Sequence, residues 1–192
     1  MRQLHTFDEV FDSQRLFRGL LDSMANPGRR CRIDMESKKM FGEYPEILAV
    51  AMTLLDTSVS FHIFGNQELE EQVVLLTHAR QRAGEEADFL FVLEPEWLEK
   101  TVAGAKSGTL ENPHASATVI IKVPEGEAEK KVCLRGPGVD GHIDLTVPAA
   151  LVRAVRLRDQ QEYEYPRGID LIFLLPGEEL MCIPRLVKME EY

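Results

Sequence analysis

Two apolar runs near the C-terminal end limit the possible folds of this chain more than any other feature. They cover residues 171–175 and 179–183, and Pro176-Gly177 separates them. Apolar runs of strand length on either side of a turn signal predict a buried β-hairpin. Asp170 and Arg185 lie at its two ends, and an unpaired charge near a core is costly. We therefore expect them to form a salt bridge or to contact a shared ligand or partner.

Composition predicts one globular domain over residues 1–192. Hydrophobic residues make up 44% of the chain and charged residues 28%, which is enough to bury a substantial core. No Ser/Gly-rich linker or long charge block divides the sequence. The net charge of -10 argues against binding to nucleic acid, whose phosphates would repel it, and against binding to anionic lipid. The cluster of Arg29, Arg30 and Arg32 is expected to be a solvated face.

The expected location is the cytoplasm. The first residues run straight into an amphipathic pattern, without the apolar region or cleavage site of a signal peptide. The longest apolar run, residues 47–55, is too short to span a bilayer. Cys31, Cys133 and Cys182 are an odd number at wide spacings, which provides neither a disulfide framework nor a close pair of metal ligands. We expect them to be reduced and buried.

The N-terminal segment predicts an amphipathic helix. Thr6 and Glu9 match a capping box, and Asn26-Pro27-Gly28 is a stop signal. Apolar side chains recur between them at helical spacing, at Val10, Phe11, Phe17, Leu20, Leu21 and Met24. This stripe is expected to face the core. The other side of the helix would carry the polar residues Asp12, Arg15, Asp22 and Ser23.

The rest of the chain alternates between helical and strand patterns. Further helices are predicted over residues 45–56, 68–82, 95–103 and 148–161. Single strands are predicted over residues 31–35, 59–63, 87–93 and 142–147. A charged loop between residues 117–122 and 132–135 predicts a second hairpin. Because helices and strands intermingle while two strand pairs are hairpins, the expected fold class is α/β with a mixed sheet and helices on its faces.

The segment Gly136-Pro137-Gly138-Val139-Asp140-Gly141 matches the GxGxxG pattern of dinucleotide sites. That fingerprint needs a helix that begins at the second glycine, whereas residues 142–147 alternate like a strand. Pro137 also lacks an amide donor. We favour a structural turn. The alternative is a loop that presents Arg135 and the Gly138 amide to a phosphate or a partner carboxylate.

No catalytic or metal-binding constellation stands out in the sequence. Asp140, His142 and Asp144 would share one face of an extended segment and could bind a divalent cation, but the solvated face of an edge strand is the favoured interpretation. No GxSxG nucleophile elbow occurs. Lys106, in a loop with two glycines, has the best context for a Schiff base with pyridoxal phosphate and is expected to be a surface residue.

Arg18 lies at the edge of the apolar stripe of the first helix, beside Phe17 and Leu20. The simplest interpretation is a side chain whose aliphatic part packs on apolar surface while its guanidinium reaches water. The functional alternative is that Arg18, Asp170 and Arg185 contribute to one polar network or contact surface.

Three segments resemble, in their order along the chain, the H subunit of the bacterial carbon-phosphorus lyase complex (PhnH). They are Phe17-Arg18-x-Leu20-Leu21-x-x-Met24-x-x-Pro27-Gly28, Leu134-Arg135-Gly136-Pro137-Gly138-Val139 and residues 166–185. The family usually continues Pro-Arg with Thr-Thr, whereas Leu186-Val187 stand here.

The resemblance implies a three-layer α/β/α sandwich with a mixed sheet, similar in topology to pyridoxal-phosphate-dependent transferases but lacking their lysine and cofactor. It implies a subunit of a core complex with the G, I and J subunits, which couples phosphonates to a ribose triphosphate moiety and later cleaves the carbon-phosphorus bond. The iron-sulfur cluster and S-adenosylmethionine of that radical step would belong to the J subunit.

We therefore expect a non-catalytic assembly subunit without a cofactor or metal of its own, which forms a homodimer or binds partners. The alternative is a subunit that binds a phosphonate or a nucleotide, with or without catalysis, in an arginine-lined pocket. Arg18, Arg135 or Arg185 would then be the anion contacts, because the arginine fork makes paired hydrogen bonds to phosphate.

Overall fold

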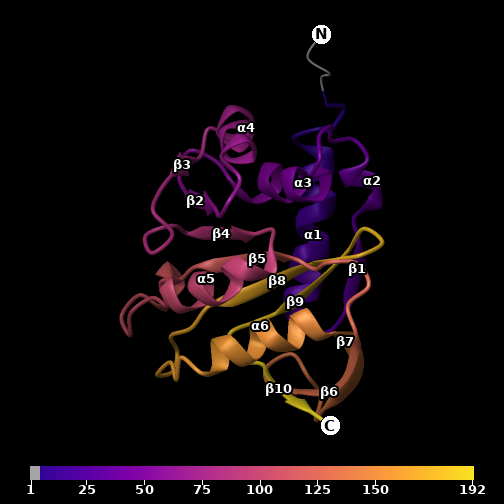
Figure 1. Cartoon of the computed structure of the whole chain (residues 1–192), viewed down its shortest axis with the longest axis vertical. Coiled ribbons are helices and arrows are strands. Elements are labelled where there is room, and N and C mark those ends of the chain that lie inside the picture. Colours follow the sequence, from indigo (N-terminus) through magenta and orange to yellow (C-terminus); the bar gives the residue numbers. More distant parts are fainter. Residues whose placement is uncertain (1–4) are drawn as a thin grey trace.

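The computed structural model describes residues 5–192 and contains a large sheet, a small sheet and several helices (Figure 1). The strands of the large sheet are β1 (Arg30–Arg32), β2 (Ser60–Ile63), β3 (Arg80–Gln81), β4 (Phe89–Val92), β5 (Thr118–Lys122), β8 (Asp170–Leu175) and β9 (Glu179–Ile183). They lie in the order β1-β9-β8-β5-β4-β2-β3. Neighbours from β8 to β3 are parallel, whereas β9 is antiparallel to both β8 and β1. The predicted α/β class with a mixed sheet is confirmed.

Helices cover both faces of the large sheet. They are α1 (Phe11–Ala25), α2 (Asp34–Ser37), α3 (Pro45–Leu54), α4 (Gln67–Thr77), α5 (Leu98–Gly104) and α6 (Ala149–Asp159), with short 3-10 turns at Pro95–Trp97 and Pro113–Ala115. Apolar side chains of α1, α3 and α4 pack in one core, and those of α5 and α6 pack in a second. In Figure 1, α5 and α6 lie in front of the sheet and α1 passes behind it.

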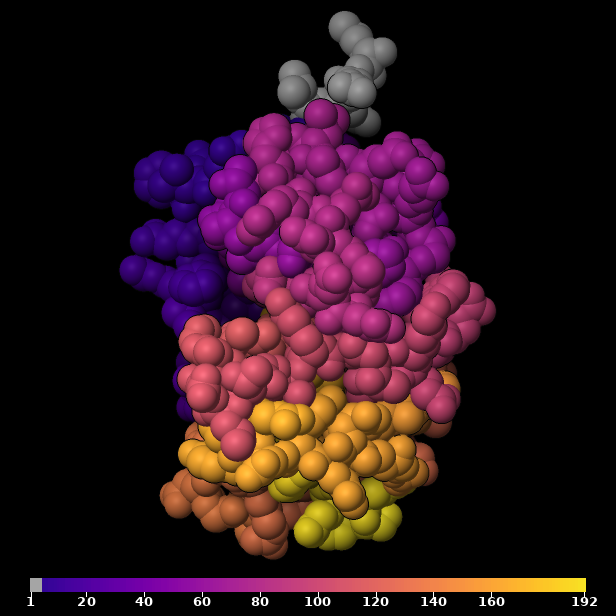
Figure 2. Space-filling view, turned by 90° about the vertical axis from the view of Figure 1, so that its left-hand side faces the viewer, coloured from indigo at the N-terminus to yellow at the C-terminus, as the bar shows by residue number. Residues whose placement is uncertain are grey.

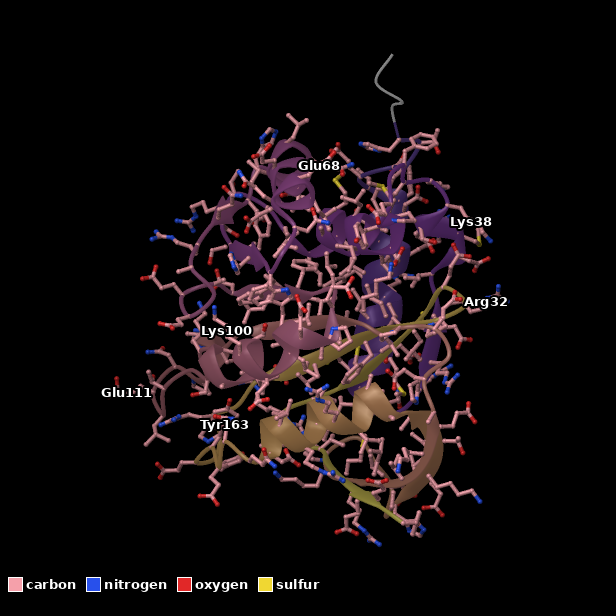
Figure 3. All side chains as sticks on the ribbon, in the orientation of Figure 1. Arg32, Lys38, Glu68, Lys100, Glu111 and Tyr163 are labelled. Atoms are coloured by element: carbon pink, nitrogen blue, oxygen red, sulfur yellow. The ribbon has the colours of Figure 1, made fainter. Side chains whose placement is uncertain are left out.

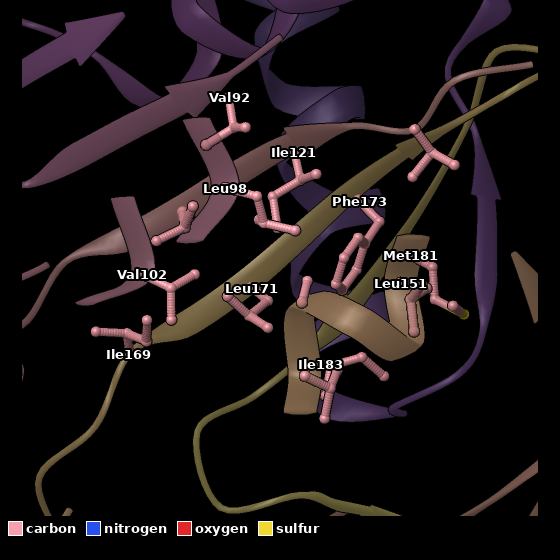
Figure 4. Close-up of a cluster of buried hydrophobic side chains, with 14 of the residues drawn as sticks. Val92, Leu98, Val102, Ile121, Leu151, Ile169, Leu171, Phe173, Met181 and Ile183 are labelled. Carbon is pink, nitrogen blue, oxygen red and sulfur yellow. The ribbon is translucent and has the colours of Figure 1, made fainter. Parts of the chain in front are cut away.

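The central strands contribute to both cores, which explains their nearly continuous apolar sequences. In β8, Leu171 and Phe173 face the core under α5 and α6, while Ile172 and Leu174 face the core on the other side. Figure 4 shows the first of these cores, where Leu171 and Phe173 point toward α6. The predicted C-terminal hairpin is confirmed, because β8 and β9 pair antiparallel on either side of Pro176-Gly177.

A second sheet contains β6 (Glu129–Arg135), β7 (Ile143–Pro148) and β10 (Lys188–Glu191), in the order β10-β6-β7. The predicted hairpin between residues 117–122 and 132–135 is therefore wrong. β5 lies between β4 and β8 in the large sheet, and β6 pairs with β7 and β10. The physical reason is that Val119, Ile120 and Ile121 are all buried, so β5 needs cover on both faces. β6 begins with Glu129-Lys130-Lys131, and these charged residues would be buried without compensation if β6 lay beside β5 in the centre of the large sheet.

Two other predicted elements end earlier in the structure than the sequence indicated. The helix predicted over residues 68–82 ends at Thr77, because His78 adopts a left-handed conformation with φ 57°, and β3 follows. The strand predicted over residues 31–35 ends at Arg32, where α2 follows. By contrast, the favoured turn at residues 136–141 is present and leads into β7 rather than a helix.

The lengths and charges of the helices show whether any of them could span a membrane. α1 has 15 residues and carries several charged side chains. No helix within residues 5–192 has the length and apolar character needed to cross a bilayer.

Candidate functional site

Asp170 and Arg185 form a salt bridge, which is the first of the two alternatives that the sequence left open. Asp170 is the first residue of β8, and Arg185 follows the end of β9 by two residues, so the antiparallel pairing brings them together. Arg185 contacts both carboxylate oxygens, with Nε 3.2 Å from Oδ2, and its backbone amide donates to Oδ1 at 2.8 Å. Arg185 Nη1 also donates to the Pro113 carbonyl at 2.6 Å. The pair thus joins three segments of the chain.

Arg18 and Arg135 lie outside this cluster. Arg18 is exposed on α1, and Arg135 is exposed at the end of β6. Within the part of the chain that the structure describes, neither side chain takes part in a salt bridge. The hydrogen-bond partners of the Asp170 and Arg185 side chains do not include Arg18. Arg18 therefore does not share a hydrogen-bond network with Asp170 and Arg185, which was one form of the functional alternative.

Most of the apolar stripe predicted for α1 faces outward, contrary to the prediction. Val10, Phe11, Phe17 and Leu21 have exposed fractions of 69%, 66%, 44% and 53%. Together with Arg18 they form a surface that we call the outer α1 face. In Figure 2, side chains of the indigo N-terminal segment project from the edge of the molecule. Of the predicted stripe, Leu20 is buried and Met24 is partly buried.

The buried side of α1 carries polar residues that were predicted to face solvent. Asp12 accepts hydrogen bonds from the Asp8 amide at 2.8 Å and from Lys39 Nζ at 2.7 Å, and it pairs with Arg15. Burial acts to raise the pKa of Asp12, but these bonds outweigh it and hold the pKa below the ordinary value of 3.8. Ser23 Oγ accepts from the Cys182 amide at 2.8 Å. Polar groups can occupy a core position when their hydrogen bonds are satisfied. Several apolar residues of α1 therefore lie on the side of the helix that faces away from the core.

The predicted capping box of Thr6 and Glu9 is also replaced. α1 begins at Phe11, and the Asp8 carboxylate accepts from the amides of Val10 and Phe11 at 2.9 and 2.8 Å. Aspartate is as good a cap as threonine and bonds to amides a few residues ahead, so Asp8 was available as a signal in the sequence.

Arg158 and Arg167 were missed by the sequence analysis. Arg158 is 1% exposed on α6 and donates to the carbonyls of Ile183, Pro184 and Val187 at 3.3, 3.0 and 2.6 Å. Both arginines line a cavity of about 210 Å³ that also contains Arg185. This cavity meets the expectation of an arginine-lined pocket, but Arg18 and Arg135 do not line it. Arg158 lies in no motif, and Arg167 lies in the family-like segment 166–185 without any signal of a site, because remote segments supply the neighbours of both.

A larger cavity of about 340 Å³ lies at the carboxyl ends of β4 and β5, beside the start of α6. Its charged lining is mixed, with Glu94 and Glu127 as well as Lys122 and Arg153. Lys122 is occupied by an ion pair with Glu46 at 2.7 Å. This lining favours neither anions nor cations.

Two other residues that the sequence singled out, Asp144 and Lys106, are held in structural contacts. Asp144 accepts from the Tyr192 hydroxyl at 2.5 Å, and no group of three or more His, Cys, Asp or Glu within residues 5–192 could hold a metal ion. Lys106 pairs with Asp88 at 2.5 Å. Burial acts to raise the pKa of Asp88, but its bonds to Lys106 and Ser60 lower it. Burial also raises the pKa of the Cys182 thiol to about 12, so this cysteine stays neutral and a poor nucleophile.

Comparisons with known proteins cover nearly the whole chain. Residues 5–190 match the model of a family described as bacterial phosphonate metabolism protein (PhnH). The α-D-ribose 1-methylphosphonate 5-triphosphate synthase subunit PhnH of Rhizobium meliloti (strain 1021) is 26% identical over 186 residues, which are 95% of this chain and 92% of the relative. A putative C-P lyase subunit protein, HtxG of Stutzerimonas stutzeri, is 28% identical over 176 residues, covering 90% of this chain and 83% of the relative.

Proposed function

Because the chain belongs to the PhnH family, we propose that it is a non-catalytic subunit of a carbon-phosphorus lyase complex and that the outer α1 face holds it there. Both relatives are named as subunits, one of a synthase and one of a C-P lyase. The proposal includes the G, I and J subunits as partners and a cytoplasmic location. It also includes a single domain over residues 1–192 with the topology of pyridoxal-phosphate-dependent transferases but without the cofactor.

The outer α1 face is the observation that supports assembly most directly. Its four apolar side chains lie along one side of α1, from the N-cap Val10 to Leu21, with the exposed Gln14 among them, and each is at least 44% exposed. Large contiguous apolar patches are rare on monomeric soluble proteins and mark contact sites. Removing apolar surface from water is favourable by about 25 cal/mol per Å², a gross gain from which the entropic costs of association are subtracted. The opposite side of the helix already packs against the core through Leu16 and Leu20.

Charge favours a different subunit as the occupant of this face, rather than a second copy of the chain. Arg18 lies among the exposed apolar residues and has no ion-pair partner within residues 5–192. In a symmetric contact between two outer α1 faces, the two Arg18 side chains would approach each other, because the residue lies near the middle of the helix. Like charges in an interface oppose association. We therefore propose an apolar partner surface with a carboxylate beside it.

The non-catalytic part of the proposal is supported by the lack of a nucleophile with a positioned base in the sequence. It is supported further by the occupied state of Asp170 and Arg185, whose hydrogen-bonding groups are used within the chain. The pair is suited to stabilising the fold rather than to chemistry.

Co-expression with the G, I and J subunits tests the proposal. We expect the wild-type chain to co-purify with them and Leu21→Glu to be lost from the complex, because a carboxylate would be buried in an apolar contact. Leu75→Glu is the matched control, since Leu75 lies on α4 and is 57% exposed compared with 53% for Leu21. It should co-purify like the wild type.

The two parts of the proposal fail in different ways. If the wild-type chain never joins the other subunits, it is not a subunit of this complex. If the wild-type chain joins them and both variants do too, the outer α1 face is not the contact. Each isolated variant should retain the wild-type melting temperature, because substitutions of exposed residues usually change stability by less than about 0.5 kcal/mol.

A further inference from the structure

The cavity beside the C-terminal hairpin has more cations than carboxylates in its lining. Arg158, Arg167, Arg185 and Lys188 contribute to it, together with the carboxylates Asp159 and Glu162 and the rings of Tyr163 and Tyr165. Four cations in one small cavity are unusual for a chain whose net charge is -10. In Figure 3, Tyr163 lies beyond the C-terminal end of α6, beside the loop that returns to β8.

Three of the four cations already have partners in the protein. Arg158 donates to three backbone carbonyls and pairs with Asp159 at 3.0 Å. Lys188 is 3.3 Å from Asp159 as well. Arg185 is bound to Asp170 and to the Pro113 carbonyl. Most of their donors are therefore occupied, and Asp159 and Asp170 offset two of the three positive charges.

Arg167 differs from them. Its Nη2 has one long hydrogen bond, to Ser107 Oγ at 3.4 Å, and its Nε is shielded from solvent without any acceptor. Within residues 5–192 no carboxylate pairs with it. A buried guanidinium donor without an acceptor costs free energy, and an anion that reaches it would recover that cost.

We infer that this cavity binds a small tetrahedral oxyanion of the phosphate or phosphonate class, with Arg167 as its main contact. The arginine fork can donate two parallel hydrogen bonds to two oxygens of such an anion. Burial raises the pKa of the Tyr163 hydroxyl above its ordinary value of 10.0, so the hydroxyl stays a donor beside Arg167.

Size limits the ligand. At about 210 Å³ the cavity is smaller than the roughly 300–1,000 Å³ of sites for drug-sized molecules. Inorganic phosphate and methylphosphonate fit that limit, whereas a complete nucleotide does not. The inference goes beyond the assembly role, since the outer α1 face and this cavity share no residue.

Calorimetric titration of the purified full-length chain with methylphosphonate and, separately, with inorganic phosphate tests the inference. We expect saturable binding of at least one of them, and a preference between the two identifies the source of the anion. Arg167→Gln should weaken binding at least about tenfold, because it removes a charge-assisted pair of hydrogen bonds. Arg153→Gln is the matched control, because it removes one exposed positive charge from the other cavity. It should leave binding unchanged.

A second variant keeps the test decisive if Arg167→Gln does not fold. Glu162 is the carboxylate of this cavity for which the structure gives no cation partner among residues 5–192, so Glu162→Gln should tighten binding. The inference is overturned if the wild-type chain binds neither anion at millimolar concentration. It is also overturned if Arg167→Gln folds and binds as tightly as Arg153→Gln, or if Glu162→Gln does not tighten binding.

Discussion

Asp170 and Arg185 show how one ion pair can fix the open end of a hairpin. Each side chain is 19% exposed, so the pair is shielded from much of the solvent that weakens surface salt bridges. Removing one partner leaves the other charge partly buried without compensation, which costs more than the pair itself contributes. The contact of Arg185 with the Pro113 carbonyl extends the same restraint to the 3-10 turn Pro113–Ala115, which precedes β5.

A double-mutant cycle tests this pairing. Asp170→Asn and Arg185→Gln should each lower the free energy of unfolding in urea, and the double variant should lose less than the sum of the two. We expect a coupling of about 1–3 kcal/mol, as for residues in direct contact. Purely additive losses would show that the two side chains do not stabilise the fold through each other.

Single residues differed in how far the sequence could place them. Asp170 and Arg185 were predictable as a pair because an antiparallel hairpin fixes which of its residues meet. Arg158 was not, because the carbonyls it binds lie 25 to 29 residues further along the chain. Asp12 was misplaced for a similar reason, since Lys39 lies 27 residues away from it.

Arg158 gives α6 a role beyond covering the large sheet. Its donors reach the segment between β9 and β10, so α6, the large sheet and the small sheet meet at this one side chain. Without it the Val187 carbonyl would lose a donor in a buried position, whereas the Pro184 carbonyl would keep its bond from the Val187 amide. A buried carbonyl without a donor costs about 1–3 kcal/mol.

Arg158→Met should therefore lower the free energy of unfolding by about 2 kcal/mol or more, because it removes charge-assisted bonds to buried carbonyls. Arg156→Met is the control, because Arg156 lies on the same helix, is 62% exposed and pairs with Glu191. Its loss should stay within about 1 kcal/mol, as for other surface pairs. Guanidinium unfolding of both variants measures the difference. Equal effects would mean that the bonds from Arg158 do not hold the segment after β9.

Elements were easier to predict than their partners. The apolar runs of β4 and β8, and the prolines at the start of α3 and α6, were sufficient to locate these four elements. The pairing of β5 was not predictable. A strand that is buried on both faces has a continuous apolar sequence, and that sequence does not indicate which strand lies next to it. For α1 the periodicity showed an apolar side, but it could not show whether that side meets the chain's own core or another protein.

At the scale of the whole molecule, the two proposed surfaces separate assembly from ligand binding. The outer α1 face lies on the helix behind the large sheet, and the Arg167 cavity lies beyond the end of α6. The resemblance to the PhnH family came from motifs spread along the chain, and the family match over residues 5–190 confirms it. The motifs could not indicate which surface meets other subunits, because α1 folds with part of its motif turned outward.

The central claim is that the outer α1 face is covered in the complex, and cysteine footprinting tests it most directly. Leu21→Cys and Leu75→Cys are labelled with a maleimide, first in the free chain and then in the complex with the G, I and J subunits. Peptide mass spectrometry separates either label from native Cys31. We expect complex formation to slow labelling at position 21 at least about tenfold, because an interface core excludes solvent, and to leave position 75 unchanged. Unchanged labelling at position 21 in an intact complex would contradict the claim.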